Sequence, residues 1–166
     1  MCRTRMLTSS DEGYKAALRW LARRSLTRAE VTQRLQRAGV ADVGAVLDRL
    51  VQNRWLSDQA VADSEAHEAA RRRLGPARLA ARLRHRGVDA AVAREVLEAL
   101  SPAEVEERAR QAVKGVISKE GVPRDPRTRE RLVRRLLRLG FSGPVVAKVL
   151  AGMPEASSAD EGGTEW

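Results

Sequence analysis

The chain has 166 residues, 3% aromatic side chains and a formal net charge of +9 at pH 7. Cys2 is its one cysteine, which excludes an intrachain disulfide framework. The first residues, MCRTRMLTSSDEG, lack the apolar core of a signal peptide, and no run of about 18 apolar residues is present, which excludes a transmembrane helix. We therefore expect a soluble protein of a reducing compartment, the cytoplasm, with no membrane partner.

The positive charge indicates an anionic partner. The sequence pI is near 11.0, and the segment 154–166 contains acidic residues but no basic one, so the rest of the chain is more basic than the whole. Nucleic acid is the first candidate, and an acidic protein surface is the second. A compositional bias toward Ala and Arg is an alternative explanation for part of the arginine content.

Helix signals begin near the N-terminus, where the pattern predicts a first helix over about residues 13–24. The next segment, LTRAEVTQRLQRAG, has Thr27 followed three residues later by Glu30, which is the spacing of a capping box. Gly39 is the left-handed residue expected to end this second helix. A short third helix, VGAVLDRL, follows it.

The same order of helices recurs twice. A helix over residues 59–73 precedes the segment PARLAARLRHRG, which leads into AVAREVLEAL. A helix over residues 102–118 begins with Ser101 and Glu104, again at capping-box spacing. Asp125 and a following proline then open the segment RTRERLVRRLLRLG, which leads into PVVAKVL. Each group of three helices spans about 50 residues, a length typical of tandem helical repeats.

Aligning the ends of the three middle helices gives equivalent positions. Two apolar positions and one glycine recur in every repeat: Val31, Leu79 and Leu132; Leu35, Leu83 and Leu136; Gly39, Gly87 and Gly140. Sustained alternation of β-branched and polar residues is absent, so no strand is predicted. The repeats are therefore predicted to bury one apolar stripe each and to end their middle helices in the same way.

These patterns predict an all-α fold of three tandem three-helix repeats in an elongated, curved, right-handed-type helical array. The predicted segments are a flexible N-terminal tail (1–12), repeat 1 (13–57), repeat 2 (58–101), repeat 3 (102–153) and an acidic disordered C-terminal tail (154–166). Trp20 and Trp55 are predicted to fill space between helices, because an aromatic side chain buries a large area.

Basic residues also recur at equivalent positions of the middle helices. One set is Arg34, Arg82 and Arg135, and the other is Arg37, His85 and Arg138. Arg78 and Arg131 match as well, although Glu30 interrupts that position in the first repeat. Arg71, Arg72 and Arg73 add charge between repeats. We predict a basic ridge that binds phosphate or carboxylate groups, with a solvated helix face as the alternative.

No residue pattern indicates catalysis or a bound cofactor. The chain has no phosphate-binding loop of the G-x-x-x-x-G-K-[ST] type. His67 and His85 are its only histidines and Cys2 its only thiol, too few for a Cys/His metal site. Acidic residues such as Glu104 are explained as favourable charges in the first turn of a helix. We expect no enzyme, no cofactor and no metal.

Three segments of the chain resemble the RecX family of recombination regulators: LTRAEVTQRLQRAGV, VLDRLVQNRWLSDQAVA and RRRLGPARLAARLRHRGV. The WLSD turn that enters a helix and the LGPARLAARL opening of the second repeat are the most specific of these. The segment TRERLVRRLLRLGFSGPVVAKVL fits as well, so the resemblance covers about residues 14–151.

The resemblance implies a function in DNA repair and recombination. Members of the family bind the RecA recombinase, lodge in the helical groove of its filament on single-stranded DNA, and suppress its ATPase, strand-exchange and co-protease activities. They are not enzymes. We therefore predict that the basic ridge faces the RecA filament and that the protein is a monomer. The choice of individual arginines rests on periodicity and charge, because no family motif marks them.

Two other functions remain open at this point. A basic protein of three-helix units could bind nucleic acid without sequence preference, and such binding would weaken steeply with salt. The middle helices lack the Asn- and Gln-rich face suited to reading bases. The chain could also be an adaptor for an acidic protein, with no dependence on DNA or nucleotide.

Overall fold

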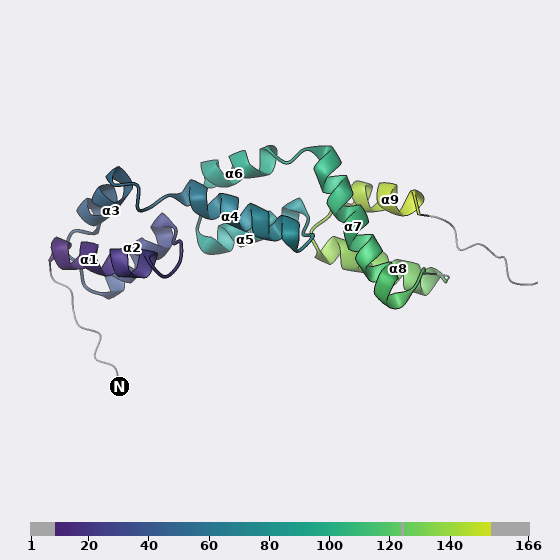
Figure 1. Ribbon diagram of the computed structural model, residues 1–166, viewed down its shortest axis with the longest axis horizontal. Coiled ribbons are helices and arrows are strands. Elements are labelled where there is room, and N and C mark those ends of the chain that lie inside the picture. Colours follow the sequence, from purple (N-terminus) through teal and green to yellow (C-terminus); the bar gives the residue numbers. More distant parts are fainter. Residues whose placement is uncertain (1–8, 124, 154–166) are drawn as a thin grey trace, which may run out of the picture. The chain divides into compact units, whose positions relative to one another are not determined.

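The computed structural model describes residues 9–123 and 125–153, and the described residues form helices and no strand. The predicted all-α class and tandem three-helix order are therefore confirmed (Figure 1). The predictions of a flexible start and of a disordered acidic end concern residues 1–8 and 154–166, which lie outside the described residues. The helices are α1 (Ser10–Leu21), α2 (Arg28–Arg37), α3 (Val43–Gln52), α4 (Asp58–Arg71), α5 (Pro76–Arg86), α6 (Ala90–Glu98), α7 (Pro102–Glu120), α8 (Pro126–Arg138) and α9 (Gly143–Ala151).

The first helix begins earlier than the pattern predicts. We expected a tail up to residue 12, but α1 starts at Ser10. The side chain of Ser9 accepts a hydrogen bond from the backbone N–H of Asp11 at 3.2 Å. Asp11 and Glu12 lie in the first turn, where negative charge interacts favourably with the helix dipole. Residues 9–12, which the sequence pattern places in the tail, therefore form the N-terminal cap and first turn of α1.

All three middle helices end in the same conformation, as predicted. Gly39, Gly87 and Gly140 have φ values of 76°, 66° and 93°. The residue after each glycine donates its backbone N–H to the carbonyl five residues earlier, at 3.2, 3.1 and 3.3 Å. This bond is the outer hydrogen bond of a Schellman motif. The recurring end of the helix thus has one structural cause in all three repeats.

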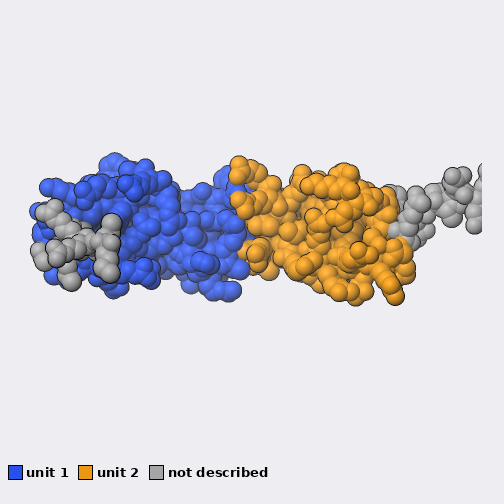
Figure 2. All heavy atoms as spheres, turned by 90° about the horizontal axis from the view of Figure 1, so that it is seen from below, with its two compact units in different colours: residues 1–68, 79–99 blue, residues 69–78, 100–166 orange. Residues whose placement is uncertain are grey.

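The chain divides into two compact units, coloured separately in Figure 2. Unit 1 consists of Met1–Glu68 and Leu79–Ala99, and unit 2 of Ala69–Arg78 and Leu100–Trp166. The second repeat is thus divided between them. The curvature and handedness predicted for the array stay predictions.

Each unit has one hydrophobic core cluster. In unit 1, α3 packs against α1 and α2 around the fully buried Val31 and Leu35. In unit 2, α9 packs against α7 and α8 around Leu132 and Leu136. The equivalent residues of the second repeat, Leu79 and Leu83, are also fully buried but belong to neither cluster. The apolar stripe of the middle helices is therefore buried in all three repeats.

Two glycines allow the backbone after α4 to meet the backbone after α8 within unit 2. The N–H of Gly75 donates to the carbonyl of Leu139 at 2.8 Å, and the N–H of Ala77 donates to the carbonyl of Gly140 at 3.2 Å. A Cβ atom on Gly75 would lie 2.3 Å from the Gly140 oxygen. The glycine of the LGPAR segment is therefore needed for a close backbone approach.

The two tryptophans have different environments. Trp20 is half-buried and packs against the core cluster of unit 1, as predicted. Trp55 is 59% exposed, so the prediction that it fills the core is wrong. After α3 the chain turns through Arg54, whose φ is 58°, and the N–H of Trp55 donates to the carbonyl of Leu50. This turn directs the next residue, Leu56, into the core instead.

Candidate partner-binding surface

The first predicted set of basic residues is already engaged inside the chain. The guanidinium of Arg34 lies 5.7 Å from the ring centre of Trp20, within cation–π range. Arg82 pairs with Glu65 at 2.7 Å, and Arg135 pairs with Glu120 at 2.6 Å. These side chains are held in place by neighbours from other helices, so they are less available to a partner than their spacing suggested.

The second predicted set is more accessible. Arg37, His85 and Arg138 are all exposed. Within residues 9–123 and 125–153, the side chains of Arg37 and Arg138 form no ion pair and no hydrogen bond. Because their charges are not neutralised by a neighbouring carboxylate, these two arginines are the ridge positions best suited to an external anion.

Helix α8 gathers several of the predicted residues on one side of unit 2. Arg131, Arg134, Leu137 and Arg138 line a shallow depression of about 350 Å³, and Leu137 is 45% exposed. Arg131, Arg135 and Arg138 also line a depression of about 180 Å³ that α8 shares with the C-terminal end of α7. The surface combines cations with an exposed apolar side chain, a composition typical of interaction surfaces.

The secondary candidates at the end of α4 and the start of α5, Arg71, Arg72, Arg73 and Arg78, mostly have partners within the chain. Arg71 and Arg72 are exposed but have interaction partners within the chain. Arg73 has a φ of 55° in the turn that ends α4, and its guanidinium lies over Gly115 of α7. Arg78 is exposed, while its backbone N–H bonds the carbonyl of Gly75. The backbone of Arg78 lies against Gly140, just after α8, but none of these four arginines lines the two depressions of α8.

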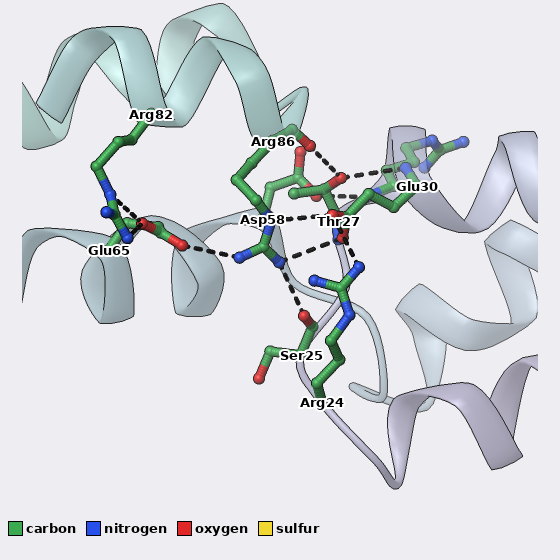
Figure 3. A network of polar contacts seen from close by, with 9 residues as sticks. Arg24, Ser25, Thr27, Glu30, Asp58, Glu65, Arg82 and Arg86 are labelled. Atoms are coloured by element: carbon green, nitrogen blue, oxygen red, sulfur yellow. Dashed lines mark hydrogen bonds and ion pairs between the residues drawn. The ribbon is translucent and has the colours of Figure 1, made fainter. Parts of the chain in front are cut away.

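An ion-pair network in unit 1 was missed by the sequence analysis (Figure 3). Arg86, at the end of α5, donates from Nε to Glu30 of α2 at 2.9 Å and from Nη1 to Glu65 of α4 at 2.8 Å. Its Nη2 donates to the carbonyl of Ser25 at 2.9 Å. The hydroxyl of Thr27, fully buried, donates to the carbonyl of Arg86 at 2.7 Å. The network therefore links the first repeat to the second.

Glu30 has an altered acidity because of this network. Burial raises the pKa of Glu30, but the hydrogen bonds from Arg86 and from the Thr27 backbone, together with the charges of Arg86 and Arg24, outweigh it. The pKa of this carboxyl therefore lies below its ordinary value of 4.5. The sequence contained one sign of this network: Glu30 stands at the position where the other two middle helices have Arg78 and Arg131. The ion pair with Arg86 explains this exception.

The described part of the chain has no cluster of three or more His, Cys, Asp or Glu side chains that could hold a metal ion. Among the described residues, no helix has both the length and the apolar character needed to cross a bilayer.

Comparison with known proteins places these features in a family. Residues 14–50 match the family model for the first three-helix domain of RecX, and residues 57–97 match the model for the second. The regulatory protein RecX of Halorhodospira halophila is 38% identical over 150 residues, covering 89% of this chain and 91% of the relative. That of Thermobifida fusca is 35% identical over 147 residues, covering 86% of this chain and 79% of the relative.

Solved structures show the same fold. The crystal structure of RecX from Lactobacillus salivarius aligns with a TM-score of 0.77 at 19% identity, covering 86% of this chain and 94% of that one. A second crystal structure of a regulatory protein RecX aligns with a TM-score of 0.72 at 20% identity, covering 86% of this chain and 71% of that one.

Proposed function

Because the chain belongs to the RecX family of regulatory proteins, we propose that it binds the RecA recombinase and inhibits it in DNA repair and recombination. The proposed target is the RecA filament on single-stranded DNA, and the inhibited activities are ATP hydrolysis, strand exchange and co-protease function. The observation that supports the proposal, beyond the family, is that Arg37 and Arg138, at equivalent ends of two middle helices, are exposed and form no ion pair or side-chain hydrogen bond among the described residues.

Inhibition by binding fits the chemistry of this surface. Arg37 belongs to unit 1 and Arg138 to unit 2, so each unit offers an arginine to the carboxylates or phosphates of a filament. Contacts made by two units of one chain add through effective concentration, even when each is weak. We propose that a monomer acts in this way in the cytoplasm, without catalysis and without a cofactor, by obstructing filament growth or promoting filament loss.

Nonspecific nucleic-acid binding is the second candidate. The observation that favours it is the concentration of arginines on α8, where Arg131 and Arg138 line the same depressions. Phosphate contacts of this kind carry no sequence information, and their affinity falls steeply as salt rises. The two candidates differ in their dependence on RecA, which the following experiment measures.

The charge-reversal variant Arg37→Glu/Arg138→Glu tests the proposal. These positions are preferable to Arg82 and Arg135, because reversing either of those would also break an internal ion pair. We expect at least about a tenfold loss of affinity for RecA filaments on single-stranded DNA, measured by co-sedimentation, with helicity unchanged by circular dichroism.

A matched control is Lys15→Glu/Lys119→Glu, which changes the net charge equally at two exposed lysines of α1 and α7. The control should retain most of the filament affinity. Equal losses in both variants would mean that net charge alone attracts the chain. Binding to bare DNA that matches binding to the filament would favour the nucleic-acid candidate.

A further inference from the structure

The third helix of the second repeat is packed differently from its counterparts. In unit 1, α3 buries Val46, Leu47 and Leu50, and in unit 2, α9 buries three residues at similar spacing. Helix α6 buries Val96 alone among its described residues. Unlike α3 and α9, it makes no extensive contact with another helix of the described chain. The apolar side of α6 is therefore less buried than those of α3 and α9.

A groove lies beside this helix within unit 1. It has a volume of about 490 Å³ and runs between α5 and α6. Its floor is aliphatic and is formed by Ala80, Val88, Ala90, Ala93 and Leu97. An apolar floor of this kind gains free energy when an apolar side chain of a ligand covers it.

The rim of the groove is charged. Arg84 from α5 and Arg94 from α6 are exposed at its edge, and Glu98 also lines it. In the part of the chain that the structure describes, neither Arg84 nor Arg94 forms an ion pair or a side-chain hydrogen bond. Two free cations beside an aliphatic floor complement a ligand that carries carboxylates next to an apolar side chain.

We propose that this groove binds an acidic amphipathic helix of the protein partner, with apolar side chains on the aliphatic floor and carboxylates at Arg84 and Arg94. A phosphate backbone is a poorer ligand, because it has no apolar side chain for the aliphatic floor. Helix-in-groove docking uses apolar anchors at helical spacing. The inference rests on the proposed function in taking the RecA filament as the partner.

Two variants change the groove in different ways. Ala93→Trp fills its floor, and Arg84→Glu/Arg94→Glu reverses the charge of its rim. Ala91→Trp is the matched control, because Ala91 is exposed on the same helix but does not line the groove. We expect each groove variant to weaken binding to RecA filaments at least tenfold, and the control to bind like the wild type, with circular dichroism reporting helicity for all.

Photo-crosslinking identifies the occupant. A benzoylphenylalanine placed at Leu97, in full-length protein bound to RecA filaments, should crosslink to an acidic helical segment of RecA when the product is read by mass spectrometry. Crosslinks to residues 154–166 of this chain, or to a second copy of it, would contradict the proposed occupant.

The outcomes separate this inference from the proposed function. If the wild type binds filaments and the groove variants bind equally well, the groove inference is wrong while the proposed function stands. If the wild type does not bind filaments, both are wrong. Loss of binding in the groove variants alone, together with a crosslink to RecA, supports both.

Discussion

Arg86 and Arg37 both lie in the basic last turn of a helix, α5 and α2, but their surroundings are opposite. Arg37 is exposed and unpaired in the described chain, whereas Arg86 contacts two carboxylates and a backbone carbonyl. The contacts of Arg86 come from α2, α4 and the turn before α2. Arg86 therefore stabilises unit 1, whereas Arg37 keeps the role in partner binding that we propose for it.

Replacing Arg86 with Ala should lower the free energy of unfolding by about 2 kcal/mol, since two partly buried carboxylates each lose one of their two arginine partners. Arg84→Ala is the control, because Arg84 lies in the same turn, is exposed and has no ion pair among the described residues. Equilibrium urea denaturation measures both variants. Similar small losses in the two would contradict a structural role for Arg86.

The lowered pKa of Glu30 predicts a specific dependence on pH. A carboxyl whose pKa is lower in the folded than in the unfolded state stabilises the fold above its unfolded pKa, here near 4.5. This contribution is lost as the pH falls from that value through the folded pKa. The difference in unfolding free energy between wild type and Glu30→Gln should therefore be largest near neutral pH and shrink below about pH 4.5. A difference that stays constant down to pH 3 would contradict the assignment.

At the scale of single elements, the start of α2 combines a helix cap with a contact between repeats. The hydroxyl of Thr27 accepts a hydrogen bond from the N–H of Glu30 at 3.1 Å and donates one to the carbonyl of Arg86. The carboxylate of Glu30 accepts a hydrogen bond from the N–H of Thr27. The capping box expected from the sequence is therefore confirmed. Its connection to α5 depends on tertiary contacts that residue spacing does not reveal.

Thr27→Ala should destabilise the protein by about 2 kcal/mol, because the buried site loses the cap of α2 and a hydrogen bond to α5. Thr27→Ser keeps the hydroxyl and removes a methyl group, so its loss should be distinctly smaller. Thermal and urea unfolding of the pair give the comparison. If Ser and Ala are equally destabilising, packing of the methyl group matters more than the hydrogen bonds.

Gly140, in the turn after α8, should tolerate substitution poorly because the backbone of Arg78 lies against it. Gly140→Ala would place a Cβ atom 2.4 Å from the backbone nitrogen of Arg78, whereas Gly121, also at positive φ, has no atom within 4 Å of such a Cβ. Gly121→Ala should cost about 1 kcal/mol from backbone conformation alone. Gly140→Ala should cost at least about 3 kcal/mol, because the backbone of residue 78 must also shift. Equal losses in urea denaturation would contradict the close approach.

Helix ends were the most predictable part of this fold. Glycine after the middle helices and Ser or Thr before a Glu act locally, so spacing alone located Gly39 and the cap at Ser101. The start of α1 and the exposure of Trp55 were not predicted. The start of α1 depends on the cap at Ser9, which lies in the segment predicted to be a tail. The exposure of Trp55 depends on the left-handed turn at Arg54.

The candidate surface was only partly predictable for a related reason. Helical periodicity indicates on which side of a helix an arginine lies, but the carboxylates opposite it come from other helices. Arg82 and Arg135 meet Glu65 and Glu120 in this way, while Arg138 meets none in the described chain. The charge pattern therefore indicates which helices carry exposed arginines, and tertiary contacts decide which of those arginines are without an ion pair.

At the scale of the whole molecule, the three sequence repeats do not correspond to three separate compact units, because the chain forms two. The first and third repeats each have a core cluster. The second lies mostly in unit 1, gives residues 69–78 to unit 2, and has no cluster of its own among the described residues. Repeat proteins gain stability from contacts between neighbours, and the Arg86 network and the glycine contact after α4 are such contacts within the two units. The groove between α5 and α6, which we propose as a partner site, lies in this second repeat.

DNA-dependent ATP hydrolysis by the cognate RecA, titrated with this protein, tests the central claim most directly. The account predicts inhibition at well below one molecule per RecA subunit, because one bound molecule affects the growth or stability of a filament of many subunits. The variant Arg37→Glu/Arg138→Glu should lose this inhibition, and Lys15→Glu/Lys119→Glu should retain it. Absence of inhibition by the wild type, together with tight and salt-sensitive binding to bare DNA, would contradict the account.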